Sequence, residues 1–220
     1  ALKKLEVRML ESPGQQISQT DPDARAMTTA GRGKAIVGYN VQTAVDTKHH
    51  LIVAHEVTNV GSDRSQLANM ALQAKEAIDY DELKVVADRG YFNGVEILAC
   101  EEAGVTAYVP KTQTSNNQAR GLFGKRDFIY HPDDNEYECP AGERLIYRFT
   151  GQDKGKSVHR YWSSACPSCR LKEKCTTADY RRVKRWEHEA VLEAMEDRVD
   201  RKPDCMRIRG STVEHPFGTI

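Results

Sequence analysis

The alternation of hydrophobic and polar positions predicts regular structure in the first half of the chain. Residues 35–46 (AIVGYNVQTAVD) and 51–58 (LIVAHEVT) alternate as β-strands do, and the polar residues 47–50 join them, which predicts an antiparallel hairpin. Asp63 then stands where an N-cap is expected, before an amphipathic helix over residues 64–78.

Residues 83–109 have the pattern of a β-α-β unit. The short apolar run at 83–87 (LKVVA) is typical of a strand buried on both faces. A helix over 95–103 is expected to end at Gly104, and residues 105–109 (VTAYV) form the next strand. Strand, helix and strand at this spacing indicate a parallel crossover in an α/β sheet.

The remaining segments set the expected domain organisation. Residues 1–34 are interpreted as the tail of a helix and a linker, and residues 35–110 as the first part of the α/β core. Residues 111–185 are polar and turn-rich and hold four of the cysteines, so they are expected to form a small insertion. Residues 186–220 return to the core, beginning with a helix over 186–199, and we expect both ends to be cut from a longer chain.

Composition excludes several classes of protein. The chain has 220 residues, 39% of them hydrophobic, which is enough for a sizeable core. No apolar stretch approaches the roughly 20 residues that span a bilayer, and no basic-then-apolar leader opens the chain. Six cysteines in a chain of this length fit a reducing compartment better than a disulfide scaffold, so a cytoplasmic protein is expected.

A net charge of zero conceals a basic segment. Residues 144–186 contain 12 Lys or Arg against 3 Asp or Glu, a local charge of +9, and six aromatic residues are interleaved with them. Basic and aromatic side chains together suit a nucleic acid, which offers both phosphates and flat bases. The alternative is a solvated face on a small domain with an aromatic core.

Two acidic residues stand out as candidates for chemistry. Asp88 follows a predicted strand at its carboxyl end, where open α/β sheets place their active sites, although a turn Asp that accepts from its own backbone explains it too. Glu214 follows Arg207 and Arg209 closely, and its alternative reading is an ordinary exposed helical Glu.

Seven segments carry a resemblance to a known family: GYNVQTAVD, LIVAHEVTN, VVADRGYFNG, ACEEAGVTAYVPK, YECPAGE, RWEHEAVLEAM and TVEHPFGTI. In this order and spacing, over residues 20–220, the chain resembles the DDE transposases of bacterial insertion sequences. The resemblance implies an RNase H-like fold, a mixed α/β sheet with helices that is interrupted here by the Cys-rich insertion. It also implies an acidic triad that holds two divalent cations, Mg²⁺ or Mn²⁺, in which Asp88 matches the second acid and Glu214 the third.

The first acid of the triad has no match in this chain. Asp21 and Asp23 lie in a Pro-containing loop, and Asp46 begins the hairpin turn, so the first acid is expected upstream of Ala1. Asp63 resembles a recurrent Asp of the family, although an N-cap explains it equally well. Gly210 stands where the family commonly has an Arg, and the chain ends before a family Lys, so the chain alone is expected to be inactive.

The function that follows is DNA transposition by metal-dependent strand cleavage and strand transfer. The expected partner is double-stranded DNA, both transposon ends and target, bound by a protein associated with the bacterial nucleoid and acting as a homodimer. A non-catalytic DNA-binding relic and a nuclease without strand joining are the alternatives. The residues expected to bind DNA phosphates are basic: Arg89, Arg181, Arg182, Lys184, Arg185, Arg207 and Arg209.

The cysteines of the insertion have metal-ligand spacing. Cys139, Cys166, Cys169 and Cys175 form the pattern C-x26-C-x2-C-x5-C. A structural Zn²⁺ ion is favoured over an iron–sulfur cluster, and reduced core thiols are the remaining alternative. Cys100 and Cys205 are interpreted as packing residues.

Overall fold

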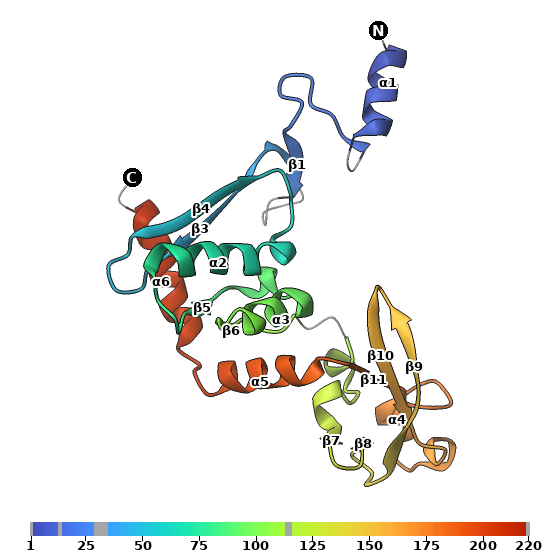
Figure 1. Cartoon of the computed structure of the whole chain (residues 1–220). Helices are drawn as coiled ribbons and strands as arrows, with labels where there is room; N and C mark the ends of the chain where they lie inside the picture. Colours follow the sequence, from blue (N-terminus) through green and yellow to red (C-terminus); the bar gives the residue numbers. More distant parts are fainter. Residues whose placement is uncertain (1, 13–14, 29–34, 113–115, 219–220) are drawn as a thin grey trace. The chain divides into compact units, whose positions relative to one another are not determined.

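A computed structural model of the chain describes residues 2–12, 15–28, 35–112 and 116–218. The chain divides into two compact units: unit 1 comprises Ala1–Lys111 and Val191–Ile220, and unit 2 comprises Thr112–Ala190 (Figure 1). Parts of the predicted linker, at 13–14 and 29–34, and the last two residues of TVEHPFGTI lie outside the described residues. Among the helices of the described ranges, none combines the length and the apolar character needed to cross a bilayer.

Unit 1 begins with helix α1 (Leu2–Glu11) and the antiparallel pair β1 (Arg25–Thr28) and β2 (Ala35–Gly38). The prediction of one strand over 35–46 and a linker before it is wrong here. The chain breaks at Tyr39, whose hydroxyl donates to Asp21 Oδ2 at 2.8 Å, and the first half of the predicted strand pairs with β1. This pairing depends on contacts that local alternation does not encode.

The predicted hairpin is confirmed as β3 (Asn40–Val45) and β4 (Ile52–Thr58), which pair antiparallel. Helix α2 (Leu67–Ile78) packs along this hairpin, and its Met70 and Ala74 form a buried cluster with Ala54 of β4 (Figure 1).

The predicted start of α2, with Asp63 as its N-cap, is wrong. A 3₁₀ turn, η2 (Asp63–Ser65), precedes the helix, and the side chain of Ser62 accepts from the backbone N–H of Arg64. The Asp63 side chain therefore does not cap α2 and contacts other residues, which are described below.

The predicted β-α-β unit is confirmed: β5 (Lys84–Val86) and β6 (Thr106–Tyr108) are parallel and are connected through α3 (Gly94–Glu102). Gly104 follows the helix with φ +68°, the left-handed conformation expected of a C′ glycine. The prediction that the first strand is buried on both faces is wrong, because Lys84 is exposed and Val85 is half-buried. In the described ranges β5 has β6 as its one paired neighbour, which leaves its other edge open.

Two helices end the chain, α5 (Glu189–Asp200) and α6 (Cys205–Gly218). Met195 of α5 is fully buried in unit 1, and its sulfur accepts from the backbone N–H of Val109 at 3.5 Å. Lys111 forms an ion pair with Glu196. The predicted helix start at 186 is wrong, because Trp186 ends a strand of unit 2.

Unit 2 is built on five antiparallel strands in the order β11-β10-β9-β8-β7. Their bounds are β7 (Ile129–His131), β8 (Glu136–Glu138), β9 (Arg144–Asp153), β10 (Lys156–Trp162) and β11 (Val183–Trp186). The connection from β10 to β11 contains a 3₁₀ turn, η6 (Cys166–Ser168), and the one-turn helix α4 (Lys172–Cys175). The buried core is small and rich in tyrosine, with Phe128, Tyr137, Leu145, Tyr161 and Val183 as its members.

Truncation of Leu67 tests the packing of α2. Leu67 is 2% exposed and Leu72 of the same helix is 46% exposed. Leu67→Ala is expected to lower the free energy of unfolding of unit 1 by about 2–5 kcal/mol, and Leu72→Ala by less than about 1 kcal/mol. Urea unfolding followed by the helical circular dichroism signal measures both. Equal effects of the two substitutions would contradict the packing described.

Candidate functional site

Asp88 lies at the carboxyl end of β5, where the sequence predicts it. Its Oδ1 accepts from the backbone N–H of Gly90 at 2.7 Å, as a turn aspartate does, and this bond begins the 3₁₀ turn η3 (Arg89–Tyr91). Its Oδ2 accepts from Nη2 of Arg209 on α6 at 3.0 Å. Asp88 therefore shapes the local turn and also holds a residue that lies 121 positions later in the sequence.

A second carboxylate, that of Asp63, also lies close to Gly90. A Cβ atom at Gly90 would lie 2.9 Å from Asp88 Oδ1 and 3.5 Å from Asp63 Oδ2, so a larger residue would collide with the Asp88 carboxylate. Asp63 Oδ1 accepts from the side-chain amides of Asn40 and Gln42, each at 2.8 Å. Glycine at position 90 thus lets two carboxylates approach one turn.

Tyr91 and Gln42 complete this cluster of polar side chains. Gln42 is 2% exposed, and its Oε1 accepts from the hydroxyl of Tyr91. Burial, together with the carboxylates of Asp63 and Asp88, raises the pKa of Tyr91 to about 12, and Arg209 opposes this rise. The Tyr91 hydroxyl therefore remains a neutral hydrogen-bond donor at physiological pH.

The sequence reasoning missed the roles of Asn40, Gln42, Asp63 and Tyr91. One signal was available: Asn40 and Gln42 occupy alternate positions, and so one face, of a strand whose neighbours are largely apolar. Polar side chains on one face of such a strand need polar partners when buried. The identity of this partner, Asp63, depends on the tertiary fold and is not visible in the local sequence.

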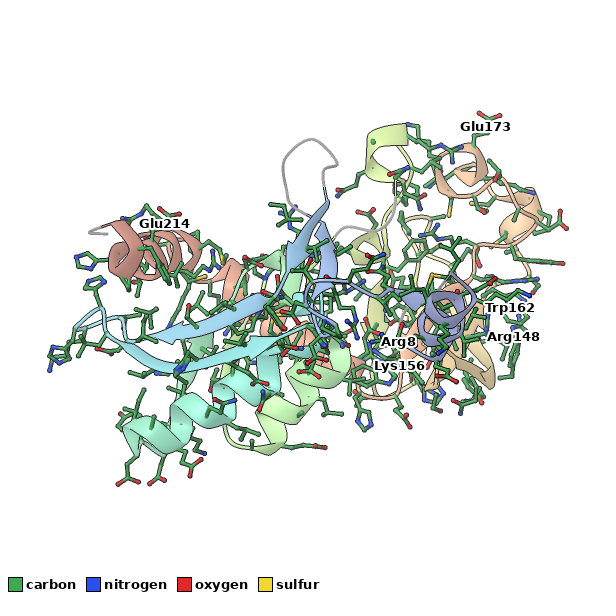
Figure 2. All side chains as sticks on the ribbon, turned by 90° about the horizontal axis from the view of Figure 1, so that it is seen from above. Arg8, Arg148, Lys156, Trp162, Glu173 and Glu214 are labelled. Carbon is green, nitrogen blue, oxygen red and sulfur yellow. The ribbon has the colours of Figure 1, made fainter. Side chains whose placement is uncertain are left out.

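The structure places Arg209, rather than Glu214, against Asp88. Both lie on α6, but five helical positions separate them by about 140° around the axis and about 7.5 Å along it. Glu214 is exposed (Figure 2) and is absent from the lining of the cavity that α6 covers. In the described parts of the chain, no group of three or more His, Cys, Asp or Glu side chains is placed to hold a metal ion.

A cavity of about 200 Å³ separates β3 from β5 inside unit 1. Its walls are largely apolar and come from α2, β3, β5 and α6, with Ala44, Met70, Val85, Ile208 and Val213 among the lining residues. In the described ranges β3 pairs with β4 alone and β5 with β6 alone. The α/β core therefore consists of separate two-stranded sheets on either side of an apolar space.

The basic residues expected in unit 1 differ in their surroundings. Arg89 is exposed in η3, directly after Asp88. Arg207 is exposed and forms an ion pair with Asp204 at 3.3 Å. Arg209 forms an ion pair with Asp88.

Two of the four basic residues predicted to bind DNA in unit 2 have their guanidinium groups in contacts within the unit. The guanidinium of Arg185 is buried, lies 3.7 Å from the ring centroid of Tyr130 and donates to the Tyr137 hydroxyl. Arg181 donates to the carbonyl of Phe123 at 3.2 Å and is half-buried. Arg182 and Lys184 are exposed, and Lys184 pairs with Asp153 at 2.6 Å.

A set of basic and aromatic side chains remains on β9, on β10 and directly before β11, with Phe149 and Arg182 exposed and the others half-buried. This basic–aromatic face consists of Arg148, Phe149, Arg160, Trp162 and Arg182. The guanidinium of Arg148 lies 5.2 Å from the Trp162 ring centroid, that of Arg182 5.6 Å from the same ring, and that of Arg160 5.5 Å from Phe149. Figure 2 shows Arg148 beside Trp162. Charges and flat rings thus lie together on one face of unit 2.

The four cysteines of the predicted metal site line one small cavity in unit 2. This thiol cluster consists of Cys139, Cys166, Cys169 and Cys175, all free and half-buried. Cys100 and Cys205 are buried in unit 1, as expected of packing residues, and burial raises the pKa of Cys100 to about 12.

The family model for the transposase DDE domain matches residues 6–220. Comparison with curated proteins and with solved structures gives no match. The matched range contains Asp88, Arg209 and Glu214 and extends over nearly the whole chain. The chain therefore belongs to the family of transposase DDE domains.

Proposed function

We propose that this chain is the catalytic region of a bacterial DNA transposase that cleaves phosphodiester bonds at transposon ends and joins them to a target. The observation that supports this most is the family match over residues 6–220, which contains an acidic residue at the carboxyl end of β5. That end of a strand is where open α/β sheets bind their ligands. The protein would act in the cytoplasm at the nucleoid, as a homodimer that holds two DNA ends.

Members of this family generally use divalent cations such as Mg²⁺. Such ions prefer carboxylate oxygens, and we assign Asp88 and Glu214 as two of the acidic residues. The residues as placed do not fit a complete site, because Asp88 is paired with Arg209 and Glu214 is exposed on α6. At least one further acidic group is needed. A metal at the thiol cluster would be structural.

A further strand would supply that group. The cavity between β3 and β5 is apolar, and each of these strands has an unpaired edge in the described part of the chain. A strand that pairs with both would merge the two small sheets into one mixed sheet of the RNase H-like kind. An acidic residue at its end would lie near Asp88. We place the first acid of the triad there, outside residues 1–220.

The residues around Asp88 have two roles in this proposal. The Gly90 N–H and the Arg209 guanidinium fix the orientation of the Asp88 carboxylate. Arg209 also offsets part of the negative charge of Asp63 and Asp88, which a DNA phosphate would otherwise meet. Arg89 and Arg207 lie on the same two elements and are suited to bidentate contacts with phosphate oxygens.

DNA contact in unit 2 is assigned to the basic–aromatic face, with Lys184 at its edge. Arginine binds phosphates, and exposed rings such as Phe149 offer a surface for stacking.

A second function, DNA binding without catalysis, is favoured by one observation. The described carboxylates do not form a complete site for a divalent cation. A protein of this kind would occupy transposon ends and compete with an intact transposase.

Neutralisation of the basic–aromatic face tests the DNA contact. Arg148→Gln combined with Arg182→Gln is expected to weaken binding to any duplex and to reduce the slope of log K against log salt by about 2, because up to two phosphate contacts are lost. The matched control, Arg170→Gln with Lys174→Gln, removes the same charge from exposed positions of unit 2. Fluorescence anisotropy at several salt concentrations gives the slopes. Equal slopes for the two double variants would refute the assignment.

Substitution of the proposed acids tests catalysis in the full-length protein that contains this chain. Asp88→Asn and Glu214→Gln are each expected to abolish strand cleavage in Mg²⁺ while DNA affinity persists. Asp81→Asn and Glu102→Gln, at exposed positions, are expected to retain cleavage. Cleavage and joining are measured on labelled transposon-end DNA. A wild-type protein that binds the DNA without cutting it would favour the second function, and an active Asp88→Asn variant would reject the assignment.

A further inference from the structure

We propose that the thiol cluster of unit 2 binds one structural Zn²⁺ ion through its four sulfur atoms. The proposal is independent of transposition and concerns how unit 2 holds its fold. It rests on three features: the turns that carry the cysteines, the cavity between them, and the scarcity of regular secondary structure in the surrounding segment.

Tight turns present the cysteines. Cys139 begins the turn Cys139-Pro140-Ala141-Gly142, in which the N–H of Gly142 donates to the Cys139 carbonyl at 2.8 Å and Gly142 has φ +80°. Cys166 and Cys169 bracket the 3₁₀ turn η6, and the N–H of Leu171 donates to Cys169 Sγ at 3.4 Å. These turns fix the backbone at Cys139, Cys166 and Cys169.

The four cysteines surround one small cavity. The cavity has a volume of about 30 Å³, and all four cysteines contribute to its walls together with Phe128 and Leu145. A tetrahedral zinc site with Zn–S bonds of about 2.3 Å places its sulfurs about 3.8 Å apart. The thiols surround the cavity without reaching ligand spacing, so binding requires them to rotate inward.

A divalent ion bound by four thiolates displaces their protons and offsets two of their four negative charges. Arg181 also lines the cavity and adds one positive charge beside the cysteines.

The segment between β10 and β11 contains little regular secondary structure. It contains only η6 and the single turn of α4 as regular structure, and both lie beside the thiol cluster. Cys139 and Cys175 pack against the five-residue core of unit 2. A metal ion that links Cys139 of the sheet to the three later cysteines would fix this segment to the core, as small scaffolds commonly require.

Metal analysis of the purified full chain, kept reduced and without added metal, tests the proposal. We expect about one zinc per chain, reduced at least fivefold in Cys169→Ser and unchanged in Cys100→Ser, a buried control outside unit 2. Chelation of the wild-type protein is expected to expose four further reactive thiols and to speed amide hydrogen exchange over residues 163–182.

The test remains valid if Cys169→Ser fails to fold, because the thiol count and the amide exchange rates are measured on the wild-type chain. Protein that lacks metal and whose thiol reactivity does not change on chelation would overturn the proposal. Iron with acid-labile sulfide in place of zinc would overturn it as well.

Discussion

The ion pair between Asp88 and Arg209 joins two segments of unit 1 that the whole of unit 2 separates in the sequence. Residues 191–220 pack against the first part of the unit. Helix α6 contacts β3 and β5, and its Arg209 and Thr212 line the cavity beside β5. The buried Met195 of α5 and the Lys111–Glu196 pair hold the same return segment. The position of α6, and with it that of Glu214, depends on these contacts.

The same pair sets the charge balance of the candidate site. Asp63 and Asp88 bring two negative charges to the turn at Gly90, and Arg209 supplies one positive charge. The amides of Asn40 and Gln42 donate to Asp63 but carry no charge, and Arg89 of the same turn adds a second positive charge. The two carboxylates are therefore balanced by two arginines around the turn. The basic–aromatic face of unit 2 differs, because its charged members are all basic.

Local signals in the sequence were sufficient for much of the fold. The turn at Asp88 and the glycine after α3 are determined by residues within a few positions of each other, and the β-α-β unit by three consecutive short elements. The structure confirms all three. The pairing of β1 with β2, the burial of Arg185 and the contact of Asp63 with β3 depend on residues far apart in the sequence, and the sequence reasoning missed them. Arg185 illustrates the difficulty. The sequence of a basic run does not distinguish an arginine that stacks on an aromatic ring, as Arg185 does on Tyr130, from an arginine that is exposed to solvent.

A double-mutant cycle on Asp88 and Arg209 tests most directly whether α6 is held at the end of β5. The free energy of opening of α6 is measured by amide hydrogen exchange in the wild type, in Asp88→Asn, in Arg209→Gln and in the double variant. Both side chains are partly exposed, so we expect a coupling energy of about 0.5–1 kcal/mol, with the double variant less destabilised than the sum of the two single variants. Effects that add to within about 0.3 kcal/mol would contradict this arrangement of the site.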